Sequence, residues 1–199
     1  NGATVKADDK KVGGGALSLD GTSYINVTDK DGNNPLIGKD EITISYWSKS
    51  TTANHGWAYY LKRNNSANSE PNKDLQNLYY LGILDGGGNS ARLEAQRFSR
   101  IRGEGALAKN SGTVSNDTWK LVTVVMKEKQ TVLYVDGAES NKSGEDQASL
   151  TDILVPGSIF YLGKATWGSG EFFKGMIDEF TVYDGALNAE QVGHLYKSV

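Results

Sequence analysis

Hydrophobic residues along this chain come in short alternating runs rather than in the long stripes of amphipathic helices. Alternation with a period of two, together with many β-branched and aromatic residues, predicts β-strands. About ten runs fit this pattern: Ala16–Leu19, Tyr24–Val27, Ile42–Trp47, Trp57–Lys62, Leu78–Leu84, Arg92–Phe98, Leu121–Met126, Val132–Val135, Ile159–Gly163 and Met176–Tyr183.

Turn-forming residues separate these runs. Asp-Gly pairs such as Asp20-Gly21 and Asp136-Gly137 are typical of tight turns between antiparallel strands. Only residues 188–196 have a helical pattern, with Asn188 placed as the N-cap. The sequence therefore predicts many hairpins and one short C-terminal helix.

Ten short strands must bury their apolar faces against a second layer, which predicts two antiparallel sheets packed face to face. An immunoglobulin-like domain would be shorter than this chain. We therefore expect an all-β fold, a two-sheet antiparallel β-sandwich of the jelly-roll type. No repeat or Pro-rich linker divides the chain, so residues 1–199 are predicted to be one domain, with a linker-like start in residues 1–14.

Composition excludes several classes of function. With 21 Lys and Arg against 24 Asp and Glu, the chain has no broad basic field, so we expect no nucleic-acid partner. The absence of cysteine excludes disulfides, thiolate metal sites and a Cys nucleophile, and two histidines are too few for a multi-histidine zinc site. No apolar stretch approaches the roughly 20 residues that span a bilayer, so no membrane partner is expected.

Five blocks of sequence carry a resemblance to a family. They occur in the order seen in laminin-G-like, concanavalin-A-like jelly-roll domains: Gly15–Val27, Ile42–Trp47, Trp119–Val125, Val132–Gly137, and Gly175–Tyr183 followed by Leu187–Gln191. The chain most resembles the bacterial branch, whose members are commonly carbohydrate-binding modules appended to secreted glycoside hydrolases. Because the same fold also serves adhesins and protein-binding receptors, the resemblance alone does not decide the function.

Asp178 falls among apolar neighbours of a predicted strand, where a carboxylate must be paired, hydrogen-bonded or bound to a cation. The resemblance implies a structural Ca²⁺ ion between Asp20 and Asp178, with backbone carbonyls near Thr22 and Ser23 completing the oxygen shell. The alternative is that Asp178 accepts hydrogen bonds from turn N–H groups and that Asp20 makes its own Asp-Gly turn.

A second signal is the mixture of rings and hydrogen-bonding groups between residues 57 and 102. If Leu61, Leu81 and Ala95 face the core, alternation turns Tyr60, Tyr80 and their neighbours to the opposite face. Rings that cover the C–H face of a sugar, beside groups that pair with its hydroxyls, are typical of carbohydrate recognition. The candidate ligand-binding residues are Trp57, Tyr60, Lys62, Tyr80, Gln96, Arg97, Arg100 and Trp167.

The residues leave the kind of glycan open. Clustered arginines would suit an acidic sugar, because a guanidinium pairs with a carboxylate through two hydrogen bonds. The resemblance instead favours neutral plant cell-wall glycans such as arabinan, xylan or galactan. The paired carboxylates of glycosidases in this fold, arranged as Glu-x-Asp-x-x-Glu, are missing from the sequence, so we expect no enzyme activity.

The sequence thus favours a monomeric, secreted or cell-surface carbohydrate-binding module of bacterial type that binds an oligo- or polysaccharide. It would hold a linked catalytic domain, a glycoside hydrolase, near that polymer. Two alternatives remain: a cell-surface adhesion domain that binds a protein or host glycan, and a structural spacer without a ligand.

Overall fold

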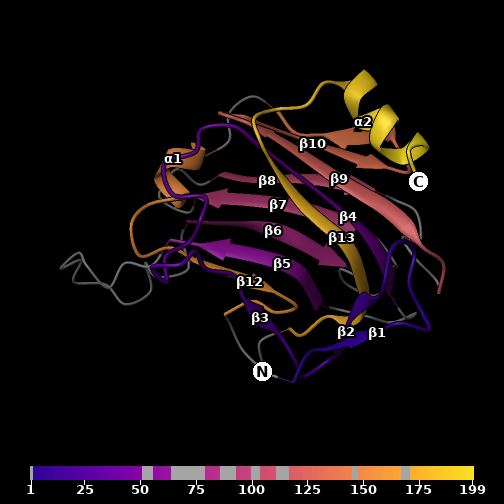
Figure 1. The fold of residues 1–199 in the computed structure, drawn as a ribbon. Coiled ribbons are helices and arrows are strands. Elements are labelled where there is room, and N and C mark those ends of the chain that lie inside the picture. Colours follow the sequence, from indigo (N-terminus) through magenta and orange to yellow (C-terminus); the bar gives the residue numbers. More distant parts are fainter. Residues whose placement is uncertain are drawn as a thin grey trace.

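The computed structural model describes residues 2–50, 56–63, 79–85, 93–99, 104–110, 117–144, 148–166 and 171–199. Within these ranges the strands form two antiparallel sheets that face each other as a sandwich (Figure 1). The expected all-β sandwich of the jelly-roll type is therefore confirmed.

One sheet has seven strands among the described residues. Its strands lie in the order β1 (Thr4–Lys6), β2 (Ala16–Asp20), β13 (Lys174–Asp184), β4 (Ile42–Ser50), β9 (Lys120–Lys127), β10 (Gln130–Val135) and β11 (Ala138–Lys142). Strand β2, near the start of the chain, pairs with β13, the last strand. This sheet therefore joins the two ends of the chain.

The other sheet has six strands in the described part of the chain. They are β3 (Ile25–Asn26), β12 (Ile159–Leu162), β5 (Gly56–Lys62), β6 (Tyr79–Asp85), β7 (Leu93–Ser99) and β8 (Glu104–Asn110), in that spatial order. The described residues also include two helices, α1 (Leu150–Ile153) and α2 (Ala189–Lys197). No helix in the described ranges has both the length and the apolar character that crossing a bilayer requires.

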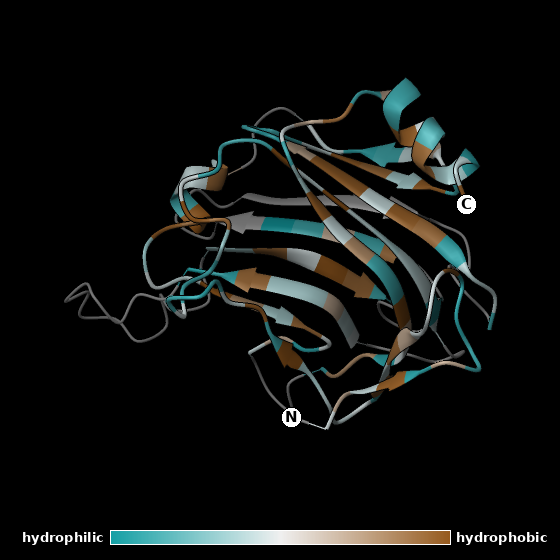
Figure 2. Ribbon diagram, viewed as in Figure 1, coloured by the Kyte–Doolittle hydropathy of each residue, from teal (hydrophilic) through white to brown (hydrophobic). Residues whose placement is uncertain are grey.

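The hydrophobic core fills the space between the sheets. Alternate residues of facing strands supply it, and Ile44, Tyr59, Leu81, Val124 and Phe160 are all 1% exposed or less. Figure 2 shows hydrophobic segments in the strands of both sheets, while α2 is largely hydrophilic. Burial of such side chains contributes about 2 kcal/mol each, so this layer holds the sandwich together.

The outer face of the seven-stranded sheet is covered by both ends of the chain. The side chain of Trp47 on β4 packs against Tyr196 of α2, with ring centroids 5.9 Å apart, and the Lys11 ammonium lies 4.4 Å from the centre of the indole. A capping box formed by Asn188 and Gln191 begins α2 and places Val192 against the sheet. The part of this face around Trp47 is therefore occupied by the protein itself.

All ten predicted strands are present, and the C-terminal helix follows Asn188 as expected. The alternation missed β1, β8, β11 and α1, which are short, polar or weakly patterned. The expectation of a linker-like start was wrong. Residues 4–6 form β1, and the backbone N–H groups of Lys11 and Val12 bond to Asp178, because that buried carboxylate needs donors.

Candidate functional site

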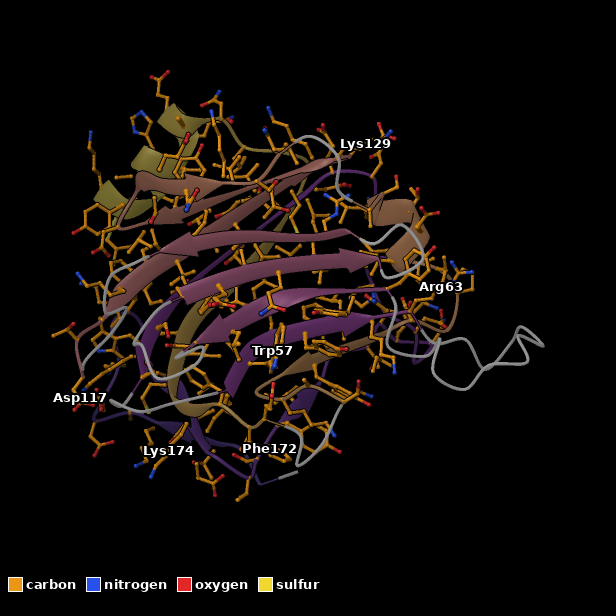
Figure 3. All side chains as sticks on the ribbon, turned by 180° about the vertical axis from the view of Figure 1, so that it is seen from behind. Trp57, Arg63, Asp117, Lys129, Phe172 and Lys174 are labelled. Carbon is orange, nitrogen blue, oxygen red and sulfur yellow. The ribbon has the colours of Figure 1, made fainter. Side chains whose placement is uncertain are left out.

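The outer face of the six-stranded sheet carries a second cluster of aromatic side chains. It lies on the side of the sheet away from the core, and Figure 3 looks onto this sheet with Trp57 near its centre. We call it the aromatic face; its packed residues are Trp57, Tyr60, Leu84 and Ala165, with Tyr80 and Tyr161 against them. Tyr60, Tyr80 and Gln96 share this face, in agreement with the alternation that predicted it.

Trp57 lies at the centre of the aromatic face but is only 1% exposed. A shift in register between Trp57 and Tyr59 lets Trp57 point to the same side as Tyr60, which regular alternation would not allow. Its indole N–H donates to Glu171 Oε2 at 2.6 Å, and its backbone N–H donates to the Glu171 carbonyl at 3.0 Å. Trp57 was predicted to bind the ligand, but its ring is closed to direct contact, because residues 171 and 172 pair with this end of β5.

Gly82 makes room for the indole. A Cβ atom at this position would lie 2.8 Å from Trp57 Cε3 and 2.5 Å from the carbonyl oxygen of Tyr59. Both distances are shorter than ordinary van der Waals contact, so the ring can rest on β6 only where the strand lacks a side chain. Trp57 thus acts as a platform beneath the face rather than as an exposed stacking ring.

Tyr60 is also fully buried, and its ring centroid lies 5.2 Å from that of Trp57 and 5.6 Å from that of Tyr80. Burial raises the pKa of the Tyr60 hydroxyl, while a hydrogen bond from Thr166 opposes the shift. The hydroxyl accepts this bond from Thr166 Oγ1 at 3.4 Å. Tyr60 therefore supports the face from below, as Trp57 does.

A chain of polar groups runs across the aromatic face from Tyr80. The Tyr80 hydroxyl donates to Gln96 Oε1 at 2.9 Å, and the Gln96 amide donates to Glu94 Oε2 at 3.0 Å. Burial, and to a lesser extent the nearby carboxylates of Glu171 and Glu94, together raise the pKa of Tyr80 to about 12. Since Tyr80 and Gln96 are only half-buried, this chain offers donors and acceptors beside an aromatic ring.

At the edge of this face, Tyr161 meets three further residues, and we call this group the ring corner: Tyr24, Tyr161, Lys164 and Phe172. The Tyr24 ring centroid lies 5.5 Å from that of Tyr161 and 6.3 Å from that of Phe172. The Lys164 ammonium lies 3.6 Å from the centre of the Tyr24 ring and 4.5 Å from that of Tyr161. All four side chains are half-buried, so the corner is accessible.

Arg97 does not belong to the aromatic face, and its assignment to the ligand site was wrong. The side chain is 1% exposed and lies on the core side of β7, with Leu93 and Ala95. Its guanidinium donates to the backbone carbonyls of Lys127 and Glu128 at the turn between β9 and β10. Burial lowers its pKa to about 10. Arg97 joins the two sheets instead of facing solvent.

The other predicted ligand-binding residues have different outcomes. Lys62 lies opposite Tyr80 in the ladder between β5 and β6, and burial lowers the pKa of its half-buried ammonium. Arg100 and Trp167 lie outside the described residues. Of the predicted set, the structure thus brings Trp57, Tyr60, Lys62, Tyr80 and Gln96 together on one face.

The residues expected to hold Ca²⁺ do not form one site. Asp20 pairs with Lys174 in the ladder between β2 and β13, whereas Asp178 is four residues further along β13. At about 3.3 Å per strand residue, the backbone positions of the two aspartates are ~13 Å apart along the strand, which is more than two aspartate side chains and one ion can span. Among the described residues, no group of three or more carboxylates or histidines has the geometry of a metal site.

Each aspartate is satisfied locally. Asp20 Oδ1 accepts from the Thr22 N–H, the Thr22 hydroxyl and the Ser23 N–H, each at 2.9 Å, and these bonds, led by that from the Thr22 backbone, lower the pKa of Asp20. Asp178 Oδ2 accepts from the N–H groups of Lys11 and Val12, and Oδ1 accepts from Glu179. Both aspartates therefore agree with the alternative to a calcium site, in which each carboxylate accepts hydrogen bonds from nearby protein groups.

A pocket of about 310 Å³ lies on the outer side of the seven-stranded sheet. Its walls include Asp20, Lys49, Lys174 and Met176, and Lys49 forms an ion pair with Asp9 at 2.9 Å. None of its lining residues is aromatic, so it lacks the flat surface that the opposite sheet provides. The aromatic face is therefore the stronger candidate site.

Sequence reasoning missed three features of the site. These are the space at Gly82, the Glu171 carboxylate that accepts from the Trp57 indole, and the ring corner with Lys164. A glycine within an otherwise alternating strand is a recognised sign of close approach, so Gly82 was open to prediction. Glu171 and Lys164 lie in segments without periodicity, and only the fold brings them to the face.

The two-sheet antiparallel sandwich is of the concanavalin A-like class. The chain belongs to the concanavalin A-like lectin/glucanases superfamily, because the model of its laminin G-like family 3 matches residues 19–193. This confirms the resemblance inferred from the five sequence blocks. A comparison with curated proteins finds no match.

Similar solved structures include domains of larger glycoside hydrolases. Domain 4 of AbnA, an extracellular GH43 arabinanase from Geobacillus stearothermophilus in complex with arabinotriose, is 18% identical, with a TM-score of 0.72 over 98% of this chain and 82% of that one. The CBM40 of the Ruminococcus gnavus IT-sialidase, bound to α2,3-sialyllactose, is 13% identical, with a TM-score of 0.71 over 91% of this chain and 96% of that one. At these identities, the likeness shows the fold.

A third similar structure belongs to another kind of protein. The heptameric SAP-like pentraxin of Limulus polyphemus is 13% identical, with a TM-score of 0.65 over 91% of this chain and 81% of that one. The fold is thus shared by proteins with different ligands and assemblies, and the site must decide what this chain binds.

Proposed function

We propose that the protein is a non-catalytic carbohydrate-binding module whose site is the aromatic face. The observation that carries the proposal is the half-buried Tyr80 ring with its hydroxyl, followed by Gln96 and Glu94 in one hydrogen-bonded chain. A sugar presents an apolar C–H face and a rim of hydroxyls, and this arrangement meets both. The buried Trp57 and Tyr60 beneath keep the face rigid, which reduces the entropy cost of binding.

The charges around Tyr80 favour a neutral glycan over an acidic one. Glu94 and Glu171 both act on the Tyr80 hydroxyl, and a sugar carboxylate bound there would be repelled. The arginine expected to attract such a carboxylate, Arg97, is turned into the core. Lys164, a cation of the same face, lies over two aromatic rings. We therefore propose that the site binds neutral sugar chains, such as those of plant cell walls.

Its role would be to hold a linked glycoside hydrolase near its polymer. Two similar structures are domains of such hydrolases, which supports this arrangement for the present chain. Tethering raises the effective concentration of the enzyme at the polymer even where each site binds weakly. It also implies a secreted or cell-surface location for the parent protein.

The test is titration calorimetry of the protein with arabino-, xylo- and galacto-oligosaccharides and, in parallel, with 3′-sialyllactose. We expect at least one neutral series to bind and sialyllactose not to bind. Tyr80→Phe removes only the hydroxyl and should weaken binding several-fold, because Gln96 loses its partner. Tyr183→Phe, on the other sheet, is the matched control and should bind as the wild type does.

Binding of sialyllactose alone would overturn the neutral assignment. If no sugar binds, the carbohydrate role itself is wrong, and the adhesion or spacer alternative takes its place. Equal affinities for wild type, Tyr80→Phe and Tyr183→Phe would move the site away from the aromatic face.

A further inference from the structure

The ring corner lies on the same side of the sheet as Tyr80 but several strands away. Tyr161 of β12 is the direct partner of Tyr60 on β5, and Phe172 forms a bridge with Trp57. The two accessible parts of the face are thus joined through the two buried rings. Figure 3 shows Phe172 below Trp57, at the margin of the sheet.

Accessibility divides this surface into two places where a sugar could lie. Trp57 and Tyr60 in the middle are 1% and 0% exposed, so their faces are closed to a ligand. Tyr80 on one side, and Tyr24 with Tyr161 on the other, are only half-buried, so each residue keeps part of its surface exposed. From β6 to β3 the sheet spans three strand spacings, or ~14 Å, a distance that one monosaccharide does not cover.

The ring corner has the chemistry of a sugar subsite in its own right. Tyr24 and Tyr161 meet edge to face at an interplanar angle of 78°, so they form two walls of a corner. The Lys164 ammonium lies against both rings and makes no ion pair with any residue that the structure describes. An ammonium has three N–H donors, so it can donate to sugar hydroxyls from this position. Contact with the rings also holds it in place.

We propose that the ring corner is a second sugar subsite, so that the ligand is an internal stretch of a neutral polysaccharide lying across the strands from Tyr80 to Tyr24. The inference rests on the proposed function and deepens it, because it selects a chain of several sugars over a single terminal sugar. One part of the chain contacts Tyr80, Gln96 and Glu94. Another part lies beside the ring corner, contacts the exposed parts of Tyr24 and Tyr161, and accepts hydrogen bonds from Lys164.

The test compares ligands of increasing length. Arabino-, xylo- and galacto-oligosaccharides, from monosaccharide to hexasaccharide, are titrated into wild type, Tyr24→Ala and Lys164→Ala. Lys142→Ala, on the exposed strand β11, is the matched control. Thermal melts verify that each variant is folded. We expect wild-type affinity to rise with chain length, and each corner variant to lose about tenfold for the longest ligand with little change for the shortest.

The outcomes separate the two proposals. If wild type binds no member of any series, the proposed function fails, and this inference fails with it. If a short oligosaccharide binds and affinity does not rise with length, the site at Tyr80 stands and the second subsite is wrong. A rise with length that is the same in Tyr24→Ala and Lys164→Ala would also overturn the assignment to the ring corner.

Discussion

Asp85 provides a quantitative test of how the interior between the sheets is built. It ends β6, is 4% exposed, and lies opposite Gly56 and Leu93 in the ladders. Burial raises its pKa from 3.8 to about 6, although a hydrogen bond with Ser50 opposes the shift. Asp85 Oδ2 is buried and has no hydrogen-bond donor among the described residues. The ionised form is therefore poorly solvated in the folded state.

The direction of the pH effect follows from the raised pKa. Between pH 3.8 and about 6 the folded state binds the proton that the unfolded state has released, so stability falls as the pH rises through this range. Below pH 3.8 both states are protonated and the penalty vanishes. Above pH 6 the loss of stability is complete. The pKa difference between 3.8 and about 6, at about 1.4 kcal/mol per unit, makes this loss about 3 kcal/mol.

Asp85→Asn removes the titrating group while preserving the shape of the side chain. The assay is denaturant unfolding of wild type and variant from pH 3.5 to about 8, with the difference in unfolding free energy plotted against pH. We expect Asp85→Asn to gain about 3 kcal/mol relative to wild type between the acidic and neutral ends. A difference that stays flat across this range would refute the reasoning, because it would mean that Asp85 ionises as easily in the fold as in water.

Three further results are expected. Gly82→Ala should lower the unfolding free energy by about 1–3 kcal/mol, because the new Cβ meets Trp57. Gly14→Ala is the control and should cost far less, because the space around Gly14 is open. Equal effects of the two substitutions would contradict the account of Trp57. Arg97→Ala should lower the unfolding free energy by about 3 kcal/mol in denaturant, because two backbone carbonyls lose their donor. The variant should keep its sugar affinity in calorimetry. A folded Arg97→Ala protein that no longer binds sugar would show that Arg97 belongs to the site. The wild-type melting temperature should be equal in EDTA and in excess Ca²⁺, because Asp20 and Asp178 already accept hydrogen bonds from protein donors. A reversible drop of the melting temperature in EDTA that is absent from Asp178→Asn would instead indicate a calcium site at these aspartates.

Local alternation was enough to predict most strands and the shared face of Tyr60, Tyr80 and Gln96. The same alternation also puts Arg97 with Leu93 and Ala95, on the core side, so the error at Arg97 came from weighing its charge above its position. Trp57 could not be placed, because a one-residue irregularity in register reverses the side to which a strand residue points.

Contacts between distant segments were beyond the reach of the sequence. Asp178 was correctly expected to need partners, but its donors come from Lys11 and Val12, far away in the chain. The same holds for Glu171, which accepts from the Trp57 indole, and for Lys164 over Tyr24. Such pairs have no local pattern, and only the closure of the sandwich brings them together.

The central claim, that a neutral glycan binds on the aromatic face, is tested most directly by NMR titration of the indole N–H signals. Trp57 lies under this face, whereas Trp47 lies on the other sheet, covered by Lys11 and Tyr196, and serves as an internal control. As arabino-, xylo- or galacto-hexasaccharide is added, the account predicts that the Trp57 signal shifts to saturation and the Trp47 signal stays fixed. A saturating shift of Trp47 with Trp57 unmoved would contradict it.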